Sequence, residues 1–286
     1  MIEVSTDLGD QVAAALREDV GSGDVTAALV PDNQVARGRV ITREDAVLCG
    51  RPWVDETFRR LDPSIQITWH ARDGDRVRAN QVVFDIQGPA RAVLTGERTA
   101  LNFLQMLSGV ATQTRVFVDA VAGTGCTILD TRKTLPGLRT AQKYAVRCGG
   151  AQNHRIGLFD RVLIKENHIA AAGSIAGSIA AAKRASPGLE IEIEVESLAG
   201  LDEALSAAPD IVMLDNFNDA DMARAVAITR ARSKSVKLEA SGNVTLDTVR
   251  AIAATGVDFI SVGGLTKHVH ATDLSMRFDF SSPATR

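Results

Sequence analysis

Charged side chains follow one short apolar run after another in the second half of this sequence. The runs are CTILD (126–130), RVLIK (161–165), IEIEVE (191–196), DIVMLD (210–215), VKLEA (236–240) and DFISVGG (258–264). The basic residues beside them are Arg132, Lys133, Arg155 and Lys165. Such side chains bind carboxylates or phosphates, arginine through a bidentate fork and lysine as a point charge. The pattern therefore predicts an anion site.

Acidic residues stand at the same positions. Glu194 and Asp215 end two of the runs, and carboxylates suit a hydroxylated sugar or a Mg²⁺ ion that also contacts substrate phosphates. In the run 190–196, glutamates alternate with apolar residues, so some of them point into the expected barrel, where they need a cation. Together with the basic residues, they favour a phosphorylated sugar substrate.

Two glycine-containing stretches could hold a phosphate with backbone amides. They are Ser241-Gly242-Asn243 and Val262-Gly263-Gly264, and each precedes an expected helix. Thr131, directly after the first run, is counted with the substrate-binding residues. His154, beside Arg155, is a better candidate for a carboxylate ligand than for a base.

The runs alternate with Ala-rich segments of helical spacing, which is how parallel strands and their crossover helices appear in sequence. We expect an α/β protein: a parallel α/β barrel, closed or incomplete, preceded by a smaller mixed α+β domain with an antiparallel sheet. A doubly wound open sheet is the alternative. In a barrel, the loops after the strands build one site, so the residues above would converge. In the first part, helical spacing appears at 8–20 and 96–110, with short strands between them.

The composition is that of an ordinary globular protein. The net charge of −3 gives no basic excess for nucleic acid or an anionic membrane. Three widely spaced cysteines without a CxxC pair argue against a disulfide framework and a zinc site. We find neither a signal peptide nor a membrane span in the sequence, and we expect a cytoplasmic protein.

Specific motifs of several other classes are missing, namely GxxxxGK[ST], GxGxxG, HExxH and GxSxG. Two rival functions stay open. One is a Schiff-base aldolase with Lys165 as its nucleophile, which the many arginines oppose. The other is a non-catalytic anion-binding protein, which the acidic residues Glu194 and Asp215 oppose, because a pure anion binder gains nothing from carboxylates.

Several motifs resemble the quinolinate phosphoribosyltransferase family over nearly the whole chain. They are EDVGSGDVT (18–26), GERTALNFLQMLSGVAT (96–112), DTRKTLPGLRTAQKYAVRCGGAQNHRIGLFDRVLIKENH (130–168), EVES (194–197), MLDN (213–216), LEASGN (238–243) and GVDFISVGGLT (256–266). Ala151, where a third glycine is expected, and Lys267, in LTKH, depart from the pattern. Both departures concern local loop geometry.

The resemblance implies an enzyme that converts quinolinate and phosphoribosyl pyrophosphate, with Mg²⁺, to nicotinate mononucleotide, pyrophosphate and CO₂ in NAD biosynthesis. It implies an N-terminal domain over 1–110, rejoined by 270–286, and a barrel over 111–269. It also implies a homodimer, or a higher homo-oligomer, in which Arg98 reaches the partner's site. Nicotinate as the acid substrate stays open.

Site residues carry over by position. The resemblance assigns the quinolinate carboxylates to Arg98, Arg132, His154, Arg155 and Lys165. It assigns phosphoribosyl pyrophosphate and its metal to Lys133, Glu194 and Asp215, which are the expected catalytic residues, with Glu194 and Asp215 as the metal ligands. The 5′-phosphate falls to 241–243 and 262–264.

Overall fold

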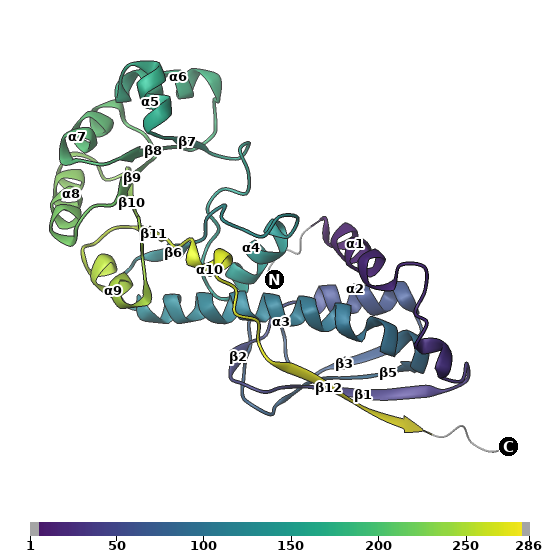
Figure 1. The fold of residues 1–286 in the computed structure, drawn as a ribbon. Helices are drawn as coiled ribbons and strands as arrows, with labels where there is room; N and C mark the ends of the chain where they lie inside the picture. The colour runs from purple at the N-terminus through teal and green to yellow at the C-terminus, as the bar shows by residue number, and fades with distance from the viewer. Residues whose placement is uncertain (1–5, 282–286) are drawn as a thin grey trace. The chain divides into compact units, whose positions relative to one another are not determined.

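The computed structural model describes residues 6–281 (Figure 1). The chain forms two compact units. The first comprises the residues up to 115, the stretch 134–150 and the residues from 268 onward; the second comprises 116–133 and 151–267. Each unit is described by itself below.

The first unit contains a four-stranded antiparallel sheet in the order β12-β1-β5-β3. Its strands are β1 (Val35–Thr42), β3 (Gln66–Trp69), β5 (Val82–Pro89) and β12 (Leu274–Ser281). A two-stranded sheet, β2 (Ala46–Val47) with β4 (Arg76–Val77), accompanies it. Because β12 comes from the end of the chain and pairs with β1 along its whole length, the C-terminal segment completes the N-terminal sheet (Figure 1).

Helices α2 (Arg51–Leu61) and α3 (Ala90–Ala120) contribute buried residues to the core of this sheet. The unit also contains α1 (Leu8–Val20), which packs on α2, the 3₁₀ turn η1 (Ala27–Leu29) and α4 (Arg139–Cys148). The core includes Val40 and Phe84 from the sheet, Val54 from α2 and Leu101 and Leu104 from α3, and all are essentially inaccessible. Burying each leucine contributes about 2 kcal/mol, so α3 is the main apolar support of the sheet.

Helix α3 is much longer than the helix expected at 96–110. It begins directly after β5 and continues to Ala120. Two glycines within it allow close packing. A Cβ atom at Gly96 would lie 2.6 Å from a side-chain carbon of Leu61, and one at Gly109 would lie 2.0 Å from the carbonyl oxygen of His270. The segment before β12 therefore passes α3 at a distance that only glycine permits.

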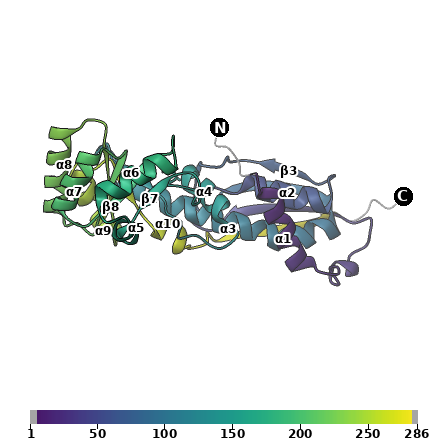
Figure 2. The ribbon, with the colours of Figure 1, turned by 90° about the horizontal axis from the view of Figure 1, so that it is seen from above.

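The second unit is built on six parallel strands in the order β6-β11-β10-β9-β8-β7. Their bounds are β6 (Thr127–Leu129), β7 (Val162–Ile164), β8 (Ile191–Val195), β9 (Ile211–Asp215), β10 (Lys237–Ser241) and β11 (Phe259–Ser261). The helices between them are α5 (Glu166–Ala172), α6 (Ile175–Ala185), α7 (Leu198–Ala207), α8 (Asp219–Arg232), α9 (Leu246–Ala254) and α10 (Gly264–Lys267). Figures 1 and 2 show α5 to α9 arranged outside the strands.

The strand order decides between the two architectures that the sequence left open. The first strand, β6, pairs with the last, β11, and all others follow in sequence without the reversal that defines a doubly wound sheet. Beyond β6, Gln152 forms a single parallel bridge with Leu129. The expected incomplete α/β barrel and the antiparallel N-terminal sheet are confirmed.

The predicted domain boundaries differ in one respect from the two compact units. The stretch 134–150, which contains α4, clusters with the first unit, whereas the sequence placed it in the barrel. Contacts within the first unit account for this, because Tyr144 of α4 donates a hydrogen bond to Asp73 (2.7 Å) and packs against Trp53 with the two rings tilted at 55°. The predicted limits 1–110 and 270–286 include residues 1–5 and 282–286, which lie outside the described residues.

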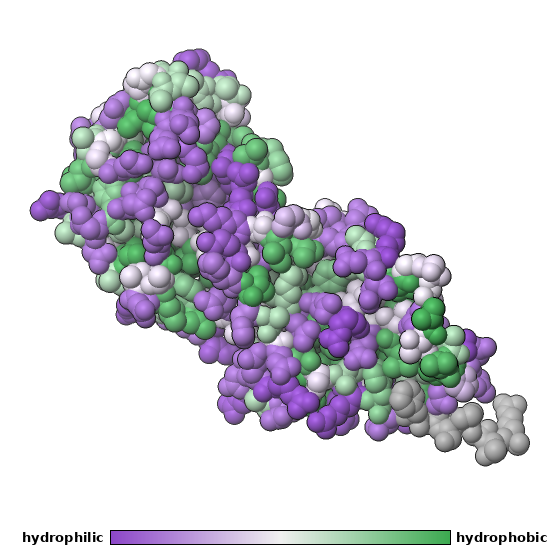
Figure 3. All heavy atoms as spheres, in the orientation of Figure 1, coloured by the Kyte–Doolittle hydropathy of each residue, from purple (hydrophilic) through white to green (hydrophobic). Residues whose placement is uncertain are grey.

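Figure 3 shows hydrophilic and hydrophobic residues intermixed on the face in view. Among the described helices, none combines the length and the apolar character that a membrane span requires.

We predict that Gly109→Ala lowers the free energy of unfolding by about 3 kcal/mol, because the new methyl group would collide with backbone rather than with a flexible side chain. Urea-induced unfolding followed by circular dichroism measures this. Gly200→Ala on α7 is the control, since its Cβ would meet neighbours at an ordinary 3.5 Å and would raise helix propensity by up to about 1 kcal/mol. Equal stability of the two variants would contradict the packing described for α3.

Candidate active site

The carboxyl ends of the parallel strands bring the expected site residues of the second unit to one edge. Asp215, at the end of β9, is in register with Ser241 at the end of β10. Lys165 directly follows β7, and the stretches 131–133 and 262–264 follow the paired strands β6 and β11. Short strands that end together therefore place basic, acidic and glycine-rich segments side by side.

Two arginines form the basic part of this edge. Burial, followed by the positive charge of Arg132, lowers the pKa of the Arg155 guanidinium. The buried Nε of Arg132 has no hydrogen-bond partner among the described residues. Two guanidinium groups that crowd each other, one with an unused donor, form a site suited to an anion.

Acidic side chains form the opposite part. Burial, followed by the carboxylates of Glu194 and Glu196, raises the pKa of Asp215. Lys165 Nζ lies 3.0 Å from Glu194 Oε2, and the side-chain amide of Asn216 donates to Asp215 Oδ2 at 2.8 Å. The carboxylates of Glu194 and Asp215 are therefore close enough to repel each other, and oxygen donors so placed fit a hard divalent cation or ribose hydroxyl groups.

Lys133 extends along the glycine-rich stretch after β11. A Cβ atom at Gly263 would lie 3.0 Å from Lys133 Cδ and 3.5 Å from Thr131 Oγ1. The hydroxyl group of Thr266 donates to the carbonyl of Lys133 (2.9 Å), and the amide of Lys133 donates to Thr131 Oγ1 (3.1 Å). Thr131, Lys133 and Gly263 thus form one local cluster.

The loop after β10 has a conformation that depends on glycine. Gly242 has φ +109°, and a Cβ there would lie 2.3 Å from Asn216 Oδ1. Asn216 and Asn243 also have positive φ, at 55° and 45°. The amide of Asn216 donates to the carbonyl of Ser241 (3.0 Å), so this loop and the residue after Asp215 are held together.

His154, which the sequence assigns to a substrate carboxylate, is nearly buried among protein partners. Only 7% of it is exposed, its Nε2 lies 2.7 Å from Glu192 Oε2, and its Nδ1 accepts the backbone N–H of Arg155 at 2.8 Å. Both ring nitrogens are therefore engaged within the protein. A second histidine, His168, accepts the N–H of Lys165 and caps α5.

Three buried acidic residues were missed as site residues. Asp130 accepts hydrogen bonds from the Asn153 side chain and from the His154 backbone, while Glu192 and Glu239 flank the His154 ring. All three have no exposed surface. The alternation in 190–196 signalled inward-facing glutamates, but the sequence did not show which of them meets a histidine.

Arg98 lies on α3, in the first unit. The N-terminal motif 18–26 supports the helix around it, because Asp24 accepts from Thr95 Oγ1 (2.8 Å) and Asp19 accepts from Thr99 Oγ1 (3.2 Å). Asp24 also accepts the amides of Thr26 and Ala27. These bonds fix the chain on both sides of Arg98.

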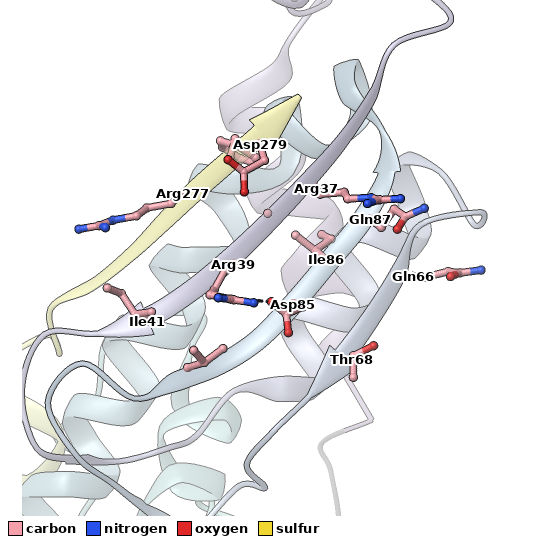
Figure 4. Close-up of a pocket in the computed structure, with 13 residues that line it drawn as sticks. Arg37, Arg39, Ile41, Gln66, Thr68, Asp85, Ile86, Gln87, Arg277 and Asp279 are labelled. Carbon is pink, nitrogen blue, oxygen red and sulfur yellow. Dashed lines mark hydrogen bonds and ion pairs between the residues drawn. The ribbon is translucent and has the colours of Figure 1, made fainter. Parts of the chain in front are cut away.

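A hollow on the open face of the N-terminal sheet has a different character (Figure 4). Arg37, Arg39 and Arg277 line it, but Asp85 pairs with Arg39 (2.9 Å) and with His70 (2.7 Å). The charges there are largely balanced within the sheet, so the strand-end edge of the second unit is the better candidate.

Comparisons with known proteins agree with the site. Residues 24–108 match the family model of the quinolinate phosphoribosyl transferase N-terminal domain, and residues 110–277 match that of its C-terminal domain. The chain belongs to the quinolinate phosphoribosyltransferase family. It is thereby a decarboxylating phosphoribosyltransferase by family.

Individual relatives cover nearly the whole chain. The nicotinate-nucleotide pyrophosphorylase (carboxylating) of Mycobacterium leprae is 43% identical over 274 residues, which are 93% of this chain and 95% of the relative. The nicotinate-nucleotide pyrophosphorylase structure from Francisella tularensis has a TM-score of 0.93 at 49% identity, covering 97% and 98% of the two chains. The structure of NadC from Streptococcus pyogenes has a TM-score of 0.94 at 37% identity, covering 99% and 100%.

We predict that Asp215→Asn stabilises the fold at pH 7 by about 0.5 kcal/mol, a value reduced for solvent screening. Because its pKa is raised on folding, the folded state binds the Asp215 proton more tightly than the unfolded chain, and ionisation at neutral pH opposes folding. The gain should vanish as the pH falls below about 3.9, the pKa of an unfolded aspartate. Urea unfolding at pH 7 and at lower pH measures it. A variant less stable than the wild type at pH 7 would contradict the crowding of carboxylates.

Proposed function

We propose that this chain transfers the phosphoribosyl group of phosphoribosyl pyrophosphate to the ring nitrogen of quinolinate, with loss of CO₂, in NAD biosynthesis. The products are nicotinate mononucleotide, pyrophosphate and CO₂. The observation that carries the proposal is the meeting of crowded guanidinium groups with crowded carboxylates at one edge of the barrel. An anionic ring acid needs the first, and a ribose with its metal-bound pyrophosphate needs the second.

Quinolinate carries two carboxylates, and the proposed ligands are cationic. Arg132 and Arg155 bind through their guanidinium forks, and Lys165 adds a point charge. Arg98, supplied by a partner subunit, completes the set. Binding the dianion relieves the repulsion between Arg132 and Arg155, which makes this edge selective for negative charge.

Phosphoribosyl pyrophosphate contacts the other half of the site. Lys133 binds the pyrophosphate and, with Thr131, lies against Gly263. The amides of the stretches 241–243 and 262–264 hold the 5′-phosphate. Glu194 and Asp215 orient the ribose hydroxyls and offset the positive charge that develops at the anomeric carbon.

Mg²⁺ fits the same carboxylates. Glu194 and Asp215 offer hard oxygen donors; burial and then the charges of Glu194 and Glu196 raise the pKa of Asp215, and a cation would offset that negative charge. When bound, Mg²⁺ stabilises the charge of the departing pyrophosphate. Most of the remaining catalysis is positioning and electrostatics, and no protein nucleophile is needed. Once the ring nitrogen is glycosylated and cationic, its charge stabilises the electron pair left on the adjacent ring carbon as the carboxylate there departs as CO₂, and that carbon then takes up a proton from water.

The two rival functions have less support. Lys165 is hydrogen-bonded to Glu194 and half exposed, unlike the desolvated lysine that a Schiff-base enzyme uses. A non-catalytic anion-binding function does not account for the crowded carboxylates of Glu194 and Asp215 at the site. The three cysteines are free thiols, in keeping with a reducing, cytoplasmic setting.

The function is tested by incubating the purified protein with Mg²⁺, phosphoribosyl pyrophosphate and either quinolinate or nicotinate. We expect stoichiometric CO₂ and nucleotide from quinolinate alone. Turnover of nicotinate would assign the non-decarboxylating class, and no turnover with either acid would overturn the proposal.

Arg132→Ala is expected to weaken quinolinate binding by about 10- to 100-fold, because hydrogen bonds to a charged group contribute about 1.5 to 3 kcal/mol. Unfolding stability should change by less than about 0.5 kcal/mol. Calorimetric titration with quinolinate measures the affinity. Arg224→Ala is the control, since this exposed arginine on α8 pairs with Asp221 and its removal changes the net charge equally. Unchanged affinity in Arg132→Ala would remove this residue from the site.

The proposed homodimer can be tested by complementation. Arg98→Ala and Asp215→Asn should each be nearly inactive, but in a coexpressed mixture a heterodimer would contain one intact site made from both chains. With equal chains and random pairing, half of the dimers are mixed and one of their two sites is intact, so the mixture should show about 25% of wild-type activity. A mixture as inactive as the single variants would contradict a shared site.

The domain division is also a proposal. A boundary near residue 110, with the C-terminal segment from 270 rejoining the first domain, agrees with the family models, which meet between 108 and 110, and with the pairing of β12 to β1.

A further inference from the structure

Three titratable side chains form a buried cluster that the proposed chemistry does not use. They are His154, Glu192 and Glu239, with 7%, 0% and 0% of their surfaces exposed. One polar atom from each lies within 4.8 Å of the others. Glu192 precedes Glu194 by two residues on β8, so the cluster adjoins the proposed substrate site from the protein interior.

The His154 ring is held in one tautomer. Because the backbone N–H of Arg155 donates to Nδ1, that nitrogen carries a lone pair and the ring proton resides on Nε2. Nε2–H then donates to Glu192 Oε2 at 2.7 Å. The Glu192 carboxylate accepts from Nε2–H, and this leaves Nδ1 of the same ring as the acceptor for the Arg155 amide.

Glu239 lies close to the same ring nitrogen of His154. Its Oε2 is 3.6 Å from His154 Nε2, and neither of its oxygens has a well-formed hydrogen bond among the described residues. Burial, followed by the charge of Glu192, raises the pKa of Glu239 well above its ordinary range. Glu192 Oε1 is likewise buried without a hydrogen-bond partner in the described chain.

The segment that carries Arg155 has no helix or strand of its own, so side chains fix its backbone. Asp130 accepts the N–H of His154 at 2.9 Å, and Asp160 accepts the amides of Ile156 and Gly157. The Arg155 amide lies between these two anchors, and its acceptor is the His154 ring. The position of the ring therefore sets the position of the Arg155 backbone.

We propose that Glu192, with Glu239 beside it, is a positioning residue for quinolinate binding: Glu192 accepts the Nε2–H of His154 and orients the ring, and His154 fixes the backbone of Arg155. None of the three needs to touch the substrate. The inference rests on the proposed function in one respect, namely that Arg155 binds a quinolinate carboxylate. It gives His154 an indirect role in place of the expected direct one.

A metal ion in the same cluster is the competing occupant. The Arg161 guanidinium lies 3.6 Å from Glu192 Oε2 and already supplies positive charge there, which opposes a second cation. Metal analysis should therefore find no stoichiometric ion in the purified wild-type protein that is lost in the Glu192→Ala variant. Such an ion would overturn the proposal.

The affinity test compares four variants by calorimetric titration with quinolinate and, separately, with phosphoribosyl pyrophosphate. Glu192→Ala should raise the Kd of quinolinate about 10-fold or more, because Arg155 loses its fixed geometry, and should leave the Kd of phosphoribosyl pyrophosphate within about twofold. Glu192→Gln retains an acceptor for Nε2–H and should restore quinolinate affinity to within about threefold, as should Glu239→Gln, which replaces a neutral acid with a neutral amide. Glu190→Gln is the matched control, an exposed glutamate on the same segment, and should bind as the wild type does.

A parallel loss of affinity for both ligands in Glu192→Ala would indicate a merely structural role and overturn the proposal, as would unchanged quinolinate affinity. Nitrogen-15 NMR of the histidine rings provides a readout that does not depend on the proposed function. His154, assigned by its loss in His154→Asn, should show a protonated Nε2 and an unprotonated Nδ1 in the free wild-type protein. A ring protonated at Nδ1 would overturn the positioning scheme even if the enzyme decarboxylates quinolinate. The expected tautomer in a protein that does not bind quinolinate would instead count against the proposed function.

Discussion

The guanidinium groups of Arg132 and Arg155 share one end of the parallel sheet, where burial and the charge of Arg132 lower the pKa of Arg155. The same strain exists among the carboxylates of Glu194, Glu196 and Asp215. Such crowding opposes folding, and the barrel tolerates it because its apolar strands and outer helices supply ample stabilisation. A ligand of opposite charge would relieve the repulsion within each of these two groups. The rest of the structure can be understood as the support that keeps these charges together.

That support consists of anchors one step behind each charged side chain. Asn216 holds the Asp215 carboxylate, and the Thr266 hydroxyl holds the carbonyl of Lys133. The buried Asp130 fixes the chain just before Arg155. Because a buried hydrogen bond is costly to leave unmade, the Asp130 anchor resists displacement more strongly than a surface contact would. Rigid placement of this kind is what catalysis by positioning requires.

The sequence predicted the architecture well because its signal is local. Short apolar runs separated by helical spacing identify parallel strands, and the strand ends named most of the polar cluster in advance. The features that the sequence did not indicate depend on contacts between distant segments. The helix expected at 96–110 is longer at both ends, from Ala90 to Ala120, and its Gly96 and Gly109 permit close packing against Leu61 and His270. The grouping of 134–150 with the first unit depends on Tyr144 meeting Asp73, and the importance of Glu192 and Glu239 depends on a histidine brought in from another segment. The periodicity of apolar residues along the chain does not indicate which distant side chains meet.

The account is tested most directly by a crystal structure of the protein with quinolinate bound. It should place the two carboxylates within hydrogen-bonding distance of the Arg132 and Arg155 side chains, at the carboxyl ends of the barrel strands, with the His154 ring still bonded to Glu192. Quinolinate bound elsewhere, for example in the arginine-lined hollow of the N-terminal sheet, would contradict the central claim that the crowded charges at the strand ends form the substrate site.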